Sequence, residues 1–87
     1  ANPTVAITAG VDDFTFTVDA GDISKFFVGC TVLVRTATWT EYSPEVKVTQ
    51  IIGNNLITNI SLGFTPTASH FIDLIGFIDE GQPYRYY

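Results

Sequence analysis

The chain has 87 residues and a formal net charge of −5, and one third of it is valine, isoleucine and threonine (8, 9 and 12 residues). Because β-branched and aromatic side chains favour strands and lose rotamer freedom in helices, this composition argues against a helical bundle, a coiled coil or a disordered chain. Four scattered basic residues against nine acidic ones argue against binding to nucleic acid.

The first two strand-like runs form a natural pair. Residues 4–9 alternate apolar with polar or small side chains, which is the pattern of a half-buried strand. A turn rich in glycine and aspartate follows, and residues 14–18 then place Phe14, Phe16 and Val18 on one face. The pattern predicts an antiparallel hairpin between the two runs.

A short helical turn is expected next, near residues 22–28. Asp22 is a favourable N-cap residue, and Ile23, Phe26 and Phe27 have the spacing of one apolar helical face. Such a turn would plug an open end of the β-structure. An irregular loop anchored by the two phenylalanines is the alternative.

The centre of the chain carries the clearest hairpin. Residues 31–39 and 45–52 both alternate apolar and polar side chains, with a polar connection between them. Within residues 51–57, two apolar runs are joined by Gly53 and Asn54, which tolerate positive φ angles. A tight β-turn is therefore predicted at this point.

The last runs complete an all-β pattern. We expect the strand after the tight turn to cover residues 56–62, and another to cover the nearly continuous apolar run 71–78, either buried on both faces or curved at Gly76. Strands of this length with turns roughly every ten residues predict one domain over residues 1–87. The expected fold is a small five- to six-stranded antiparallel barrel, SH3-like or OB-like, because closure leaves few open edges. A small β-sandwich is the alternative.

Cysteine and histidine usage limits the chemistry of the chain. Cys30 is the only cysteine, so no intrachain disulfide forms, and its place at the start of an apolar strand predicts a buried, unreactive thiol. One cysteine and one histidine do not make an ordinary zinc site. The glycosylation sequon at residues 59–61 falls in a predicted strand and is interpreted as a chance match.

Two further patterns contain residue types of known sites but lack the spacing that such sites require. Ser69, His70 and Asp73 contain the residue types of a catalytic triad, but adjacent side chains on an extended backbone point to opposite sides. The acidic pairs 12–13 and 79–80 lack the alternating oxygen ligands of a calcium loop and are interpreted as solvated turns. We therefore expect no enzyme, no catalytic residues, no metal and no cofactor.

Aromatic residues outside the predicted core are the better candidates for an interaction site. Tyrosine and tryptophan combine a large contact area with a polar tip, which suits interfaces. Protein–protein contact and stacking on a sugar ring are the two functional interpretations, and folding back over the barrel as a cap is the structural one. The candidate residues are Trp39, Tyr42, Tyr84, Tyr86 and Tyr87.

Several segments resemble the small β-modules of virion proteins from tailed bacteriophages. The resemblance rests on GDISKFFVG at 21–29, EVKVTQIIGNNLI at 45–57, GFTPTA at 63–68, and the runs 71–77 and 83–87. It implies a structural, non-enzymatic role in a capsid, for example as a decoration protein, or in a tail. It transfers no functional residues, because such modules share no site motif.

The sequence thus leads to one expected function and one alternative. The expected function is a virion structural subunit that binds capsid or tail surfaces, with other virion proteins and copies of itself as partners. The alternative is a carbohydrate-binding module that uses exposed aromatic residues. No apolar run approaches a membrane span and no segment resembles a signal peptide, so we expect a virion or otherwise soluble location and no membrane partner.

Overall fold

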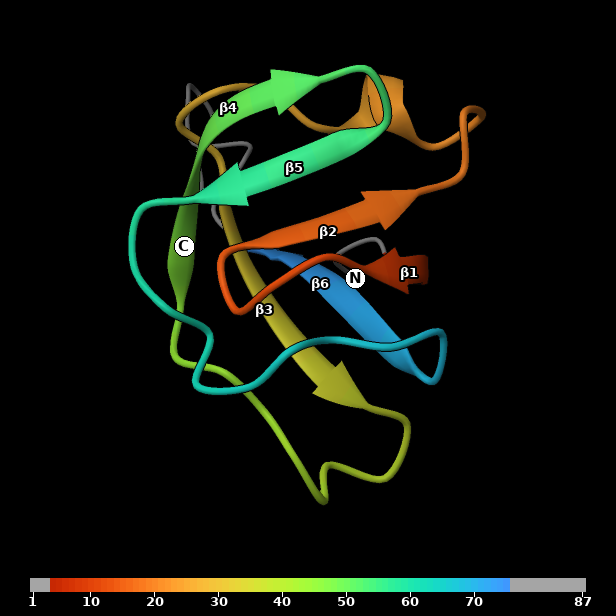
Figure 1. The fold of residues 1–87 in the computed structure, drawn as a ribbon, viewed down its shortest axis with the longest axis vertical. Coiled ribbons are helices and arrows are strands. Elements are labelled where there is room, and N and C mark those ends of the chain that lie inside the picture. Colours follow the sequence, from red (N-terminus) through yellow and green to blue (C-terminus); the bar gives the residue numbers. More distant parts are fainter. Residues whose placement is uncertain (1–3, 76–87) are drawn as a thin grey trace.

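The computed structural model describes residues 4–75 and shows a closed antiparallel barrel of six strands (Figure 1). Around the barrel the strands follow the order β1-β2-β5-β4-β3-β6, and β6 returns to pair with β1. The prediction of a small all-β antiparallel barrel is confirmed, and the sandwich alternative is wrong because the sheet closes on itself. The strands are β1 (Thr4–Gly10), β2 (Thr15–Val18), β3 (Thr31–Thr36), β4 (Val46–Ile52), β5 (Asn55–Thr58) and β6 (His70–Ile75).

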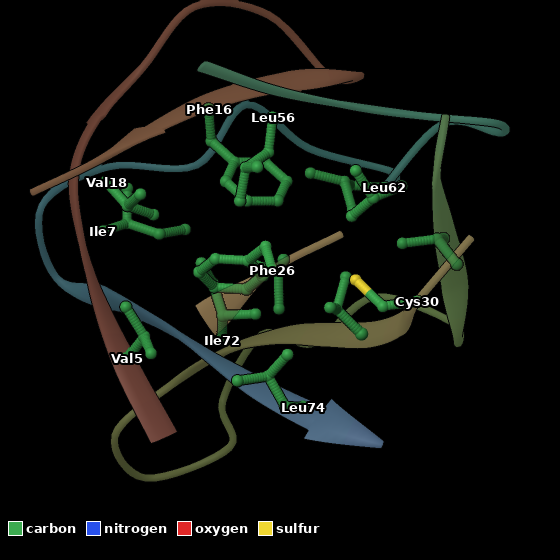
Figure 2. Close-up of a cluster of buried hydrophobic side chains, with 14 residues drawn as sticks. Val5, Ile7, Phe16, Val18, Phe26, Cys30, Leu56, Leu62, Ile72 and Leu74 are labelled. Atoms are coloured by element: carbon green, nitrogen blue, oxygen red, sulfur yellow. The ribbon is translucent and has the colours of Figure 1, made fainter. Parts of the chain in front are cut away.

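Alternation along each strand builds the core. Side chains at i and i+2 share a face, so inward and outward residues alternate where pairing is regular. Register shifts interrupt this alternation in β1 and β4. On β3, Val32 and Val34 are fully buried while Leu33 and Arg35 lie on the outer face, as the sequence predicts. The inward side chains meet in one cluster (Figure 2). Its members are Val5, Ile7, Phe16, Val18, Phe26, Cys30, Val32, Val34, Val46, Val48, Leu56, Leu62, Ile72 and Leu74.

The predicted hairpin of β1 and β2 is present, with one correction. Ile7 pairs with Val18 and Gly10 with Phe16, and the register shifts once between these pairs. Phe14 was predicted to share the buried face of Phe16, but it precedes β2 and is 38% exposed. The reason is local, since the Asp12 carboxylate accepts the backbone N–H of Phe14 at 2.8 Å and holds that residue in the turn.

The expected helical turn is a three-residue 3₁₀ helix, η1 (Ile23–Lys25). Phe26 fills the core, but Phe27 is 47% exposed, so the prediction that the two share an apolar face is wrong. The helix ends before Phe26, which is extended, and successive residues of an extended chain point to opposite sides. Asp22 occupies the N-cap position without a capping hydrogen bond and instead pairs with Lys25 Nζ at 2.7 Å.

The tight hairpin between β4 and β5 is confirmed. Gly53 and Asn54 form its two-residue turn, and Gly53 has a φ of +61°. A glycine at the first central position is typical of the turns that match the twist of paired strands. The second arm is shorter than predicted, because Thr58 ends β5 and its hydroxyl donates to the carbonyl of Ile60 at 2.8 Å. Leu62, in the following bend, is nevertheless buried in the core.

The last strand closes the barrel. β6 pairs with β3 over its whole length and with β1 at its centre. It alternates in burial, so the prediction of a strand covered on both faces is wrong for its described part. Residues 76–78, including the predicted bend at Gly76, lie outside the described residues. The connection before β6 lies against β1, since a β-carbon on Gly10 would overlap the carbonyl oxygen of Pro66.

Candidate interaction site

The connection between β3 and β4, residues 37–45, carries two of the aromatic residues that the sequence singled out, and we call it the aromatic loop. It projects from one end of the barrel (Figure 1). Trp39 is 48% exposed and Tyr42 is 63% exposed. Their ring centroids lie 6.1 Å apart with the ring planes at 57°. The two aromatic side chains are thus neighbours on the surface.

After the end of β3, the chain turns back and residues 41–43 bond to residues 34–36, which makes an irregular hairpin rather than a regular pair of strands. The N–H of Thr36 donates to the carbonyl of Glu41 at 2.9 Å, and Glu41 N–H donates to the Thr36 hydroxyl at 3.1 Å. Ser43 N–H donates to the Val34 carbonyl, and Val34 N–H donates to the Ser43 hydroxyl. These bonds join residues 34–36 to residues 41–43. The tip of the loop, residues 37–40 with Trp39, lies beyond them and points outward.

Trp39 has an unusual backbone conformation. Its φ is +61°, in the left-handed region, and it is the only non-glycine residue with positive φ in the described part of the chain. For a bulky L-residue this conformation costs roughly 1–2 kcal/mol. The N–H of Trp39 donates to the Thr36 carbonyl at 3.1 Å, which fixes the turn. The fold therefore keeps a large aromatic side chain exposed at an energetic cost.

An arginine supports the Trp39 ring. The guanidinium carbon of Arg35 lies 4.7 Å from the Trp39 ring centroid and 5.9 Å from that of Phe71. Arg35 binds Asp73 through two hydrogen bonds of 2.7 and 3.0 Å, and the Thr4 hydroxyl donates to Asp73 at 2.9 Å. The hydrogen bonds from Arg35 hold the pKa of Asp73 below its usual range and raise the pKa of Arg35. The guanidinium is thereby fixed beneath the aromatic loop.

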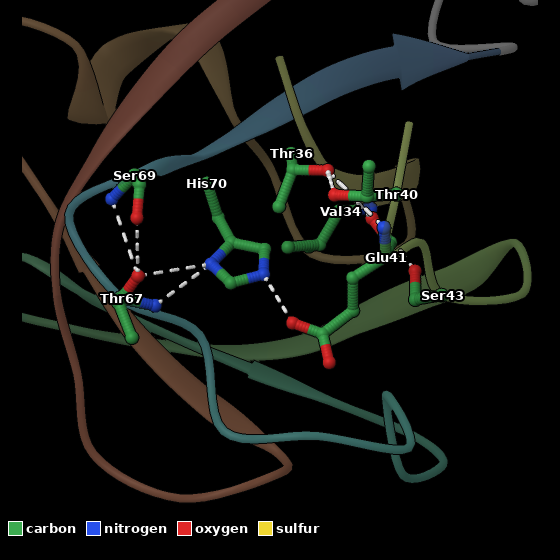
Figure 3. A network of polar contacts seen from close by, with 8 residues as sticks. All are labelled: Val34, Thr36, Thr40, Glu41, Ser43, Thr67, Ser69 and His70. Carbon is green, nitrogen blue, oxygen red and sulfur yellow. Dashed lines mark hydrogen bonds and ion pairs between the residues drawn. The ribbon is translucent and has the colours of Figure 1, made fainter. Parts of the chain in front are cut away.

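A second polar group reaches the loop from β6 (Figure 3). The His70 side chain is 5% exposed, and its Nε2 lies 2.9 Å from Oε1 of Glu41. The backbone N–H of Thr67 donates to His70 Nδ1 at 3.0 Å. The Phe64 ring stacks on the imidazole, with centroids 4.9 Å apart and planes at 19°. His70 is therefore a buried residue at the start of a strand with both ring nitrogens occupied.

The residue types of a triad are not brought together. Asp73 binds Arg35 on the outer face of β6, while His70 points inward and meets Glu41. Ser69 Oγ lies 2.9 Å from the Thr67 hydroxyl, which is itself 3.2 Å from His70 Nδ1. Alternation along β6 explains the separation of His70 from Asp73, because two residues three positions apart in a strand have their side chains on opposite faces.

Other patterns from the sequence have structural roles. Cys30 is 1% exposed, which confirms the prediction of a buried side chain, and burial raises the pKa of its thiol. Asp13 accepts the Ser61 hydroxyl at 2.6 Å. Asn59 lies in a bend after β5 rather than in the predicted strand, and its side-chain Oδ1 accepts the backbone N–H of Lys47 at 3.0 Å. Residues 79–80 lie outside the described residues.

The three tyrosines of the predicted site, Tyr84, Tyr86 and Tyr87, also lie outside the described residues. Between residues 4 and 75, no cluster of three or more His, Cys, Asp or Glu side chains could hold a metal ion, and no pocket opens on the surface. Within the same residues, no helix has the length and apolar character needed to cross a membrane. The other large apolar side chains that are exposed among the described residues are Val11, Phe14, Phe27, Val28, Ile52 and Ile60.

Sequence reasoning identified the two aromatic residues but missed the groups that support them. Arg35 and Asp73 stand on the outer faces of β3 and β6, and Glu41 and His70 are 29 positions apart. Only the pairing of β3 with β6 brings these residues together, and that pairing has no local signal in the sequence. Comparison with protein-family models, with curated proteins and with solved structures finds no match.

Proposed function

We propose that the protein is a non-enzymatic binding module that attaches to another protein through the aromatic loop. The observation that carries the proposal is the exposure of Trp39 and Tyr42 on a loop whose backbone and underlying arginine are fixed. Tryptophan, tyrosine and arginine are the residue types that dominate binding energies at protein interfaces. A fixed loop loses little conformational entropy on binding, which favours affinity.

The resemblance to phage virion modules gives this proposal its setting. The partner would be the surface of a capsid or tail, with other copies of the chain as neighbours. A barrel without open edges suits such a role, because exposed strand edges would promote uncontrolled association at high copy number. The net charge of −5 also favours a partner surface with basic or neutral character.

The geometry supports protein contact over sugar stacking. A sugar platform presents ring faces to the flat side of a pyranose, whereas the Trp39 and Tyr42 rings are inclined at 57°. One face of Trp39 is also occupied by the Arg35 guanidinium. Two inclined rings form a wedge, which suits insertion between side chains of a partner protein.

The test is co-sedimentation of the purified chain with capsids and with tails, prepared separately from a phage found to carry its coding sequence. We expect the wild type to bind one of them, and Trp39→Ala or Tyr42→Ala to weaken binding about 10- to 100-fold. Phe27→Ala is the matched control, because Phe27 is an equally exposed aromatic residue outside the loop, and it should bind like the wild type.

Two results would contradict the proposal. One is a chain that stays monomeric in sedimentation equilibrium and binds neither particle. The other is binding that survives both loop substitutions. A glycan array separates the alternative, since specific hits that disappear with Trp39→Ala would establish carbohydrate binding in place of protein contact.

A further inference from the structure

One hydrogen bond joins a side chain of the aromatic loop to a part of the described barrel outside the loop's own hairpin. The loop's other hydrogen bonds stay within its own hairpin, between residues 34–36 and 39–43. Among the described residues, the bond from His70 Nε2 to Glu41 Oε1 is the only hydrogen bond that joins residues 37–45 to an element outside that hairpin. Glu41 lies between Trp39 and Tyr42 in the chain, so this bond holds the loop where its aromatic side chains are displayed.

The hydrogen bonds around His70 select one tautomer of its imidazole. A backbone N–H can only donate, so the bond from Thr67 N–H at 3.0 Å requires Nδ1 to be an unprotonated acceptor. The proton of the neutral imidazole is then on Nε2, where it donates to the Glu41 carboxylate at 2.9 Å. The stacked Phe64 ring fixes the plane of the imidazole, so the direction of the Nε2–H group is set by residues outside the aromatic loop.

The two partners differ in exposure in a way that matters for the role of the bond. The His70 side chain is 5% exposed, and that of Glu41 is 49% exposed. His70 is therefore a buried anchor, and the Glu41 side chain reaches it from the exposed surface of the loop. No other charged side chain of the described residues forms an ion pair with either of them, since Arg35 on the opposite face is bound by Asp73.

We propose that His70 is a positioning residue for the aromatic loop: held as the Nε2-protonated tautomer by Thr67, it fixes Glu41 and thereby the orientation of Trp39 and Tyr42. This inference rests on the proposed function, because it assigns His70 a part in presenting the binding surface. Without the bond, the tip would pivot on its own hairpin, and a partner would have to immobilise it on binding.

The free protein provides the decisive measurements, because Trp39 is the only tryptophan and His70 the only histidine of the chain. Time-resolved fluorescence anisotropy and acrylamide quenching report on the tip of the loop alone. In Glu41→Ala, we expect a new fast anisotropy decay and stronger quenching. Glu41→Gln keeps an acceptor oxygen and should restore both signals to the wild-type values. Glu45→Ala removes the same charge from an exposed position in the same loop and should change neither.

The tautomer is measured separately by ¹⁵N NMR near neutral pH. We expect a pyrrole-type Nε2 and a pyridine-type Nδ1 for His70 in the wild type, and the same pattern in Glu41→Ala because Thr67 is unchanged. A protonated Nδ1 in the folded wild type, or Trp39 signals that are identical in Glu41→Ala and wild type, would overturn the inference. Backbone amide spectra confirm that each variant is folded.

Binding then separates this inference from the proposed function. If the proposed function holds, Glu41→Ala should bind its particle about 2- to 10-fold more weakly, while Glu41→Gln binds like the wild type. If no variant binds any particle but Glu41→Ala loosens the tip, the proposed function fails and the positioning role stands. If Trp39→Ala abolishes binding while Glu41→Ala keeps a rigid tip and full affinity, the positioning role fails and the proposed function stands.

Discussion

Trp39 combines properties that are unfavourable for stability at the scale of a single residue. It is bulky, it has a left-handed backbone, and about half of its side chain faces solvent. Its ring contacts with the Arg35 guanidinium at 4.7 Å and with the Tyr42 ring at 6.1 Å offset part of this cost, and the first contributes roughly 0.5–1 kcal/mol at an exposed site. Backbone strain that persists in a fold is concentrated at binding and switching sites. The strain at Trp39 is thus the pattern that the proposed binding role of the aromatic loop requires.

The strain at position 39 predicts that glycine is more stabilising than alanine there, the reverse of the usual order. Alanine keeps the strained φ of +61° without the tryptophan contacts, whereas glycine adopts that angle freely. Trp39→Gly should therefore be more stable than Trp39→Ala by about 1 kcal/mol in urea denaturation. At Tyr42, which has no positive φ, the order should be the usual one, with Tyr42→Gly below Tyr42→Ala. Equal stabilities of the two Trp39 variants would contradict the strain.

At the scale of elements, the barrel depends on close contact between its strands and their connections. The 3₁₀ helix inserts Phe26 into the core, and the connection from β5 to β6 inserts Leu62 and buries Pro66. Pro66 lies so near the end of β1 that only glycine fits at position 10. Turns and connections thus complete the packing that short strands of four to seven residues begin.

The contact between β1 and the β5–β6 connection can be tested with one methyl group. In Gly10→Ala the added β-carbon overlaps the Pro66 carbonyl, and backbone atoms cannot rotate away as a side chain can. We expect a loss of about 1–3 kcal/mol, seen as a fall in Tm of roughly 4–8 °C for each kcal/mol. Gly21→Ala is the control, because its nearest neighbour is a flexible Asp19 carboxylate oxygen at 3.2 Å. A Tm unchanged by Gly10→Ala would show that the connection is not in contact with β1.

At the scale of the whole molecule, one polar cluster joins three strands on the outer surface. Asp73 of β6 accepts hydrogen bonds from Arg35 of β3 and Thr4 of β1. Its side chain is 20% exposed and that of Arg35 is 15% exposed, so solvent screens the pair less than a fully exposed ion pair. The cluster therefore links the first, third and sixth strands of the barrel.

This cluster predicts a defined acid dependence of stability. Because the pKa of Asp73 is lower in the folded state than in the unfolded chain, its contribution is complete above the unfolded value of about 3.9 and is lost as pH falls through the lower folded value. Asp73→Asn should cost about 1–2 kcal/mol near neutral pH. The difference from wild type should vanish at acid pH, measured by urea denaturation at several pH values.

Asp22→Asn provides the comparison for the acid dependence. It removes the same charge from an exposed pair with Lys25, and exposed pairs contribute little to stability. We expect stability close to that of wild type at every pH. A pH-independent loss in Asp73→Asn would contradict the role of the charged carboxylate and indicate a loss of packing instead.

Local patterns predicted much of this fold and little of its site. The alternation of apolar and polar residues correctly predicted most of the side chains that the strands bury, and Gly53 with Asn54 correctly predicted the β4–β5 turn. The errors at Phe14 and Phe27 arose where a turn or a short helix changed which side a residue faces. The support of the aromatic loop by Arg35 and His70 depends on strand pairing between distant segments, for which the sequence contains no local signal.

The position of β6 between β1 and β3 has a consequence for how the barrel forms. Asp73 of β6 bonds to Thr4 of β1, and these two residues are 69 positions apart in the chain. Pairings between segments so far apart slow folding, since a large loop must close before any contact is made. Until β6 has paired, β1 and β3 each lack a neighbour and present an unpaired edge. A chain in which β6 has not yet paired is thus prone to join another chain through these two edges.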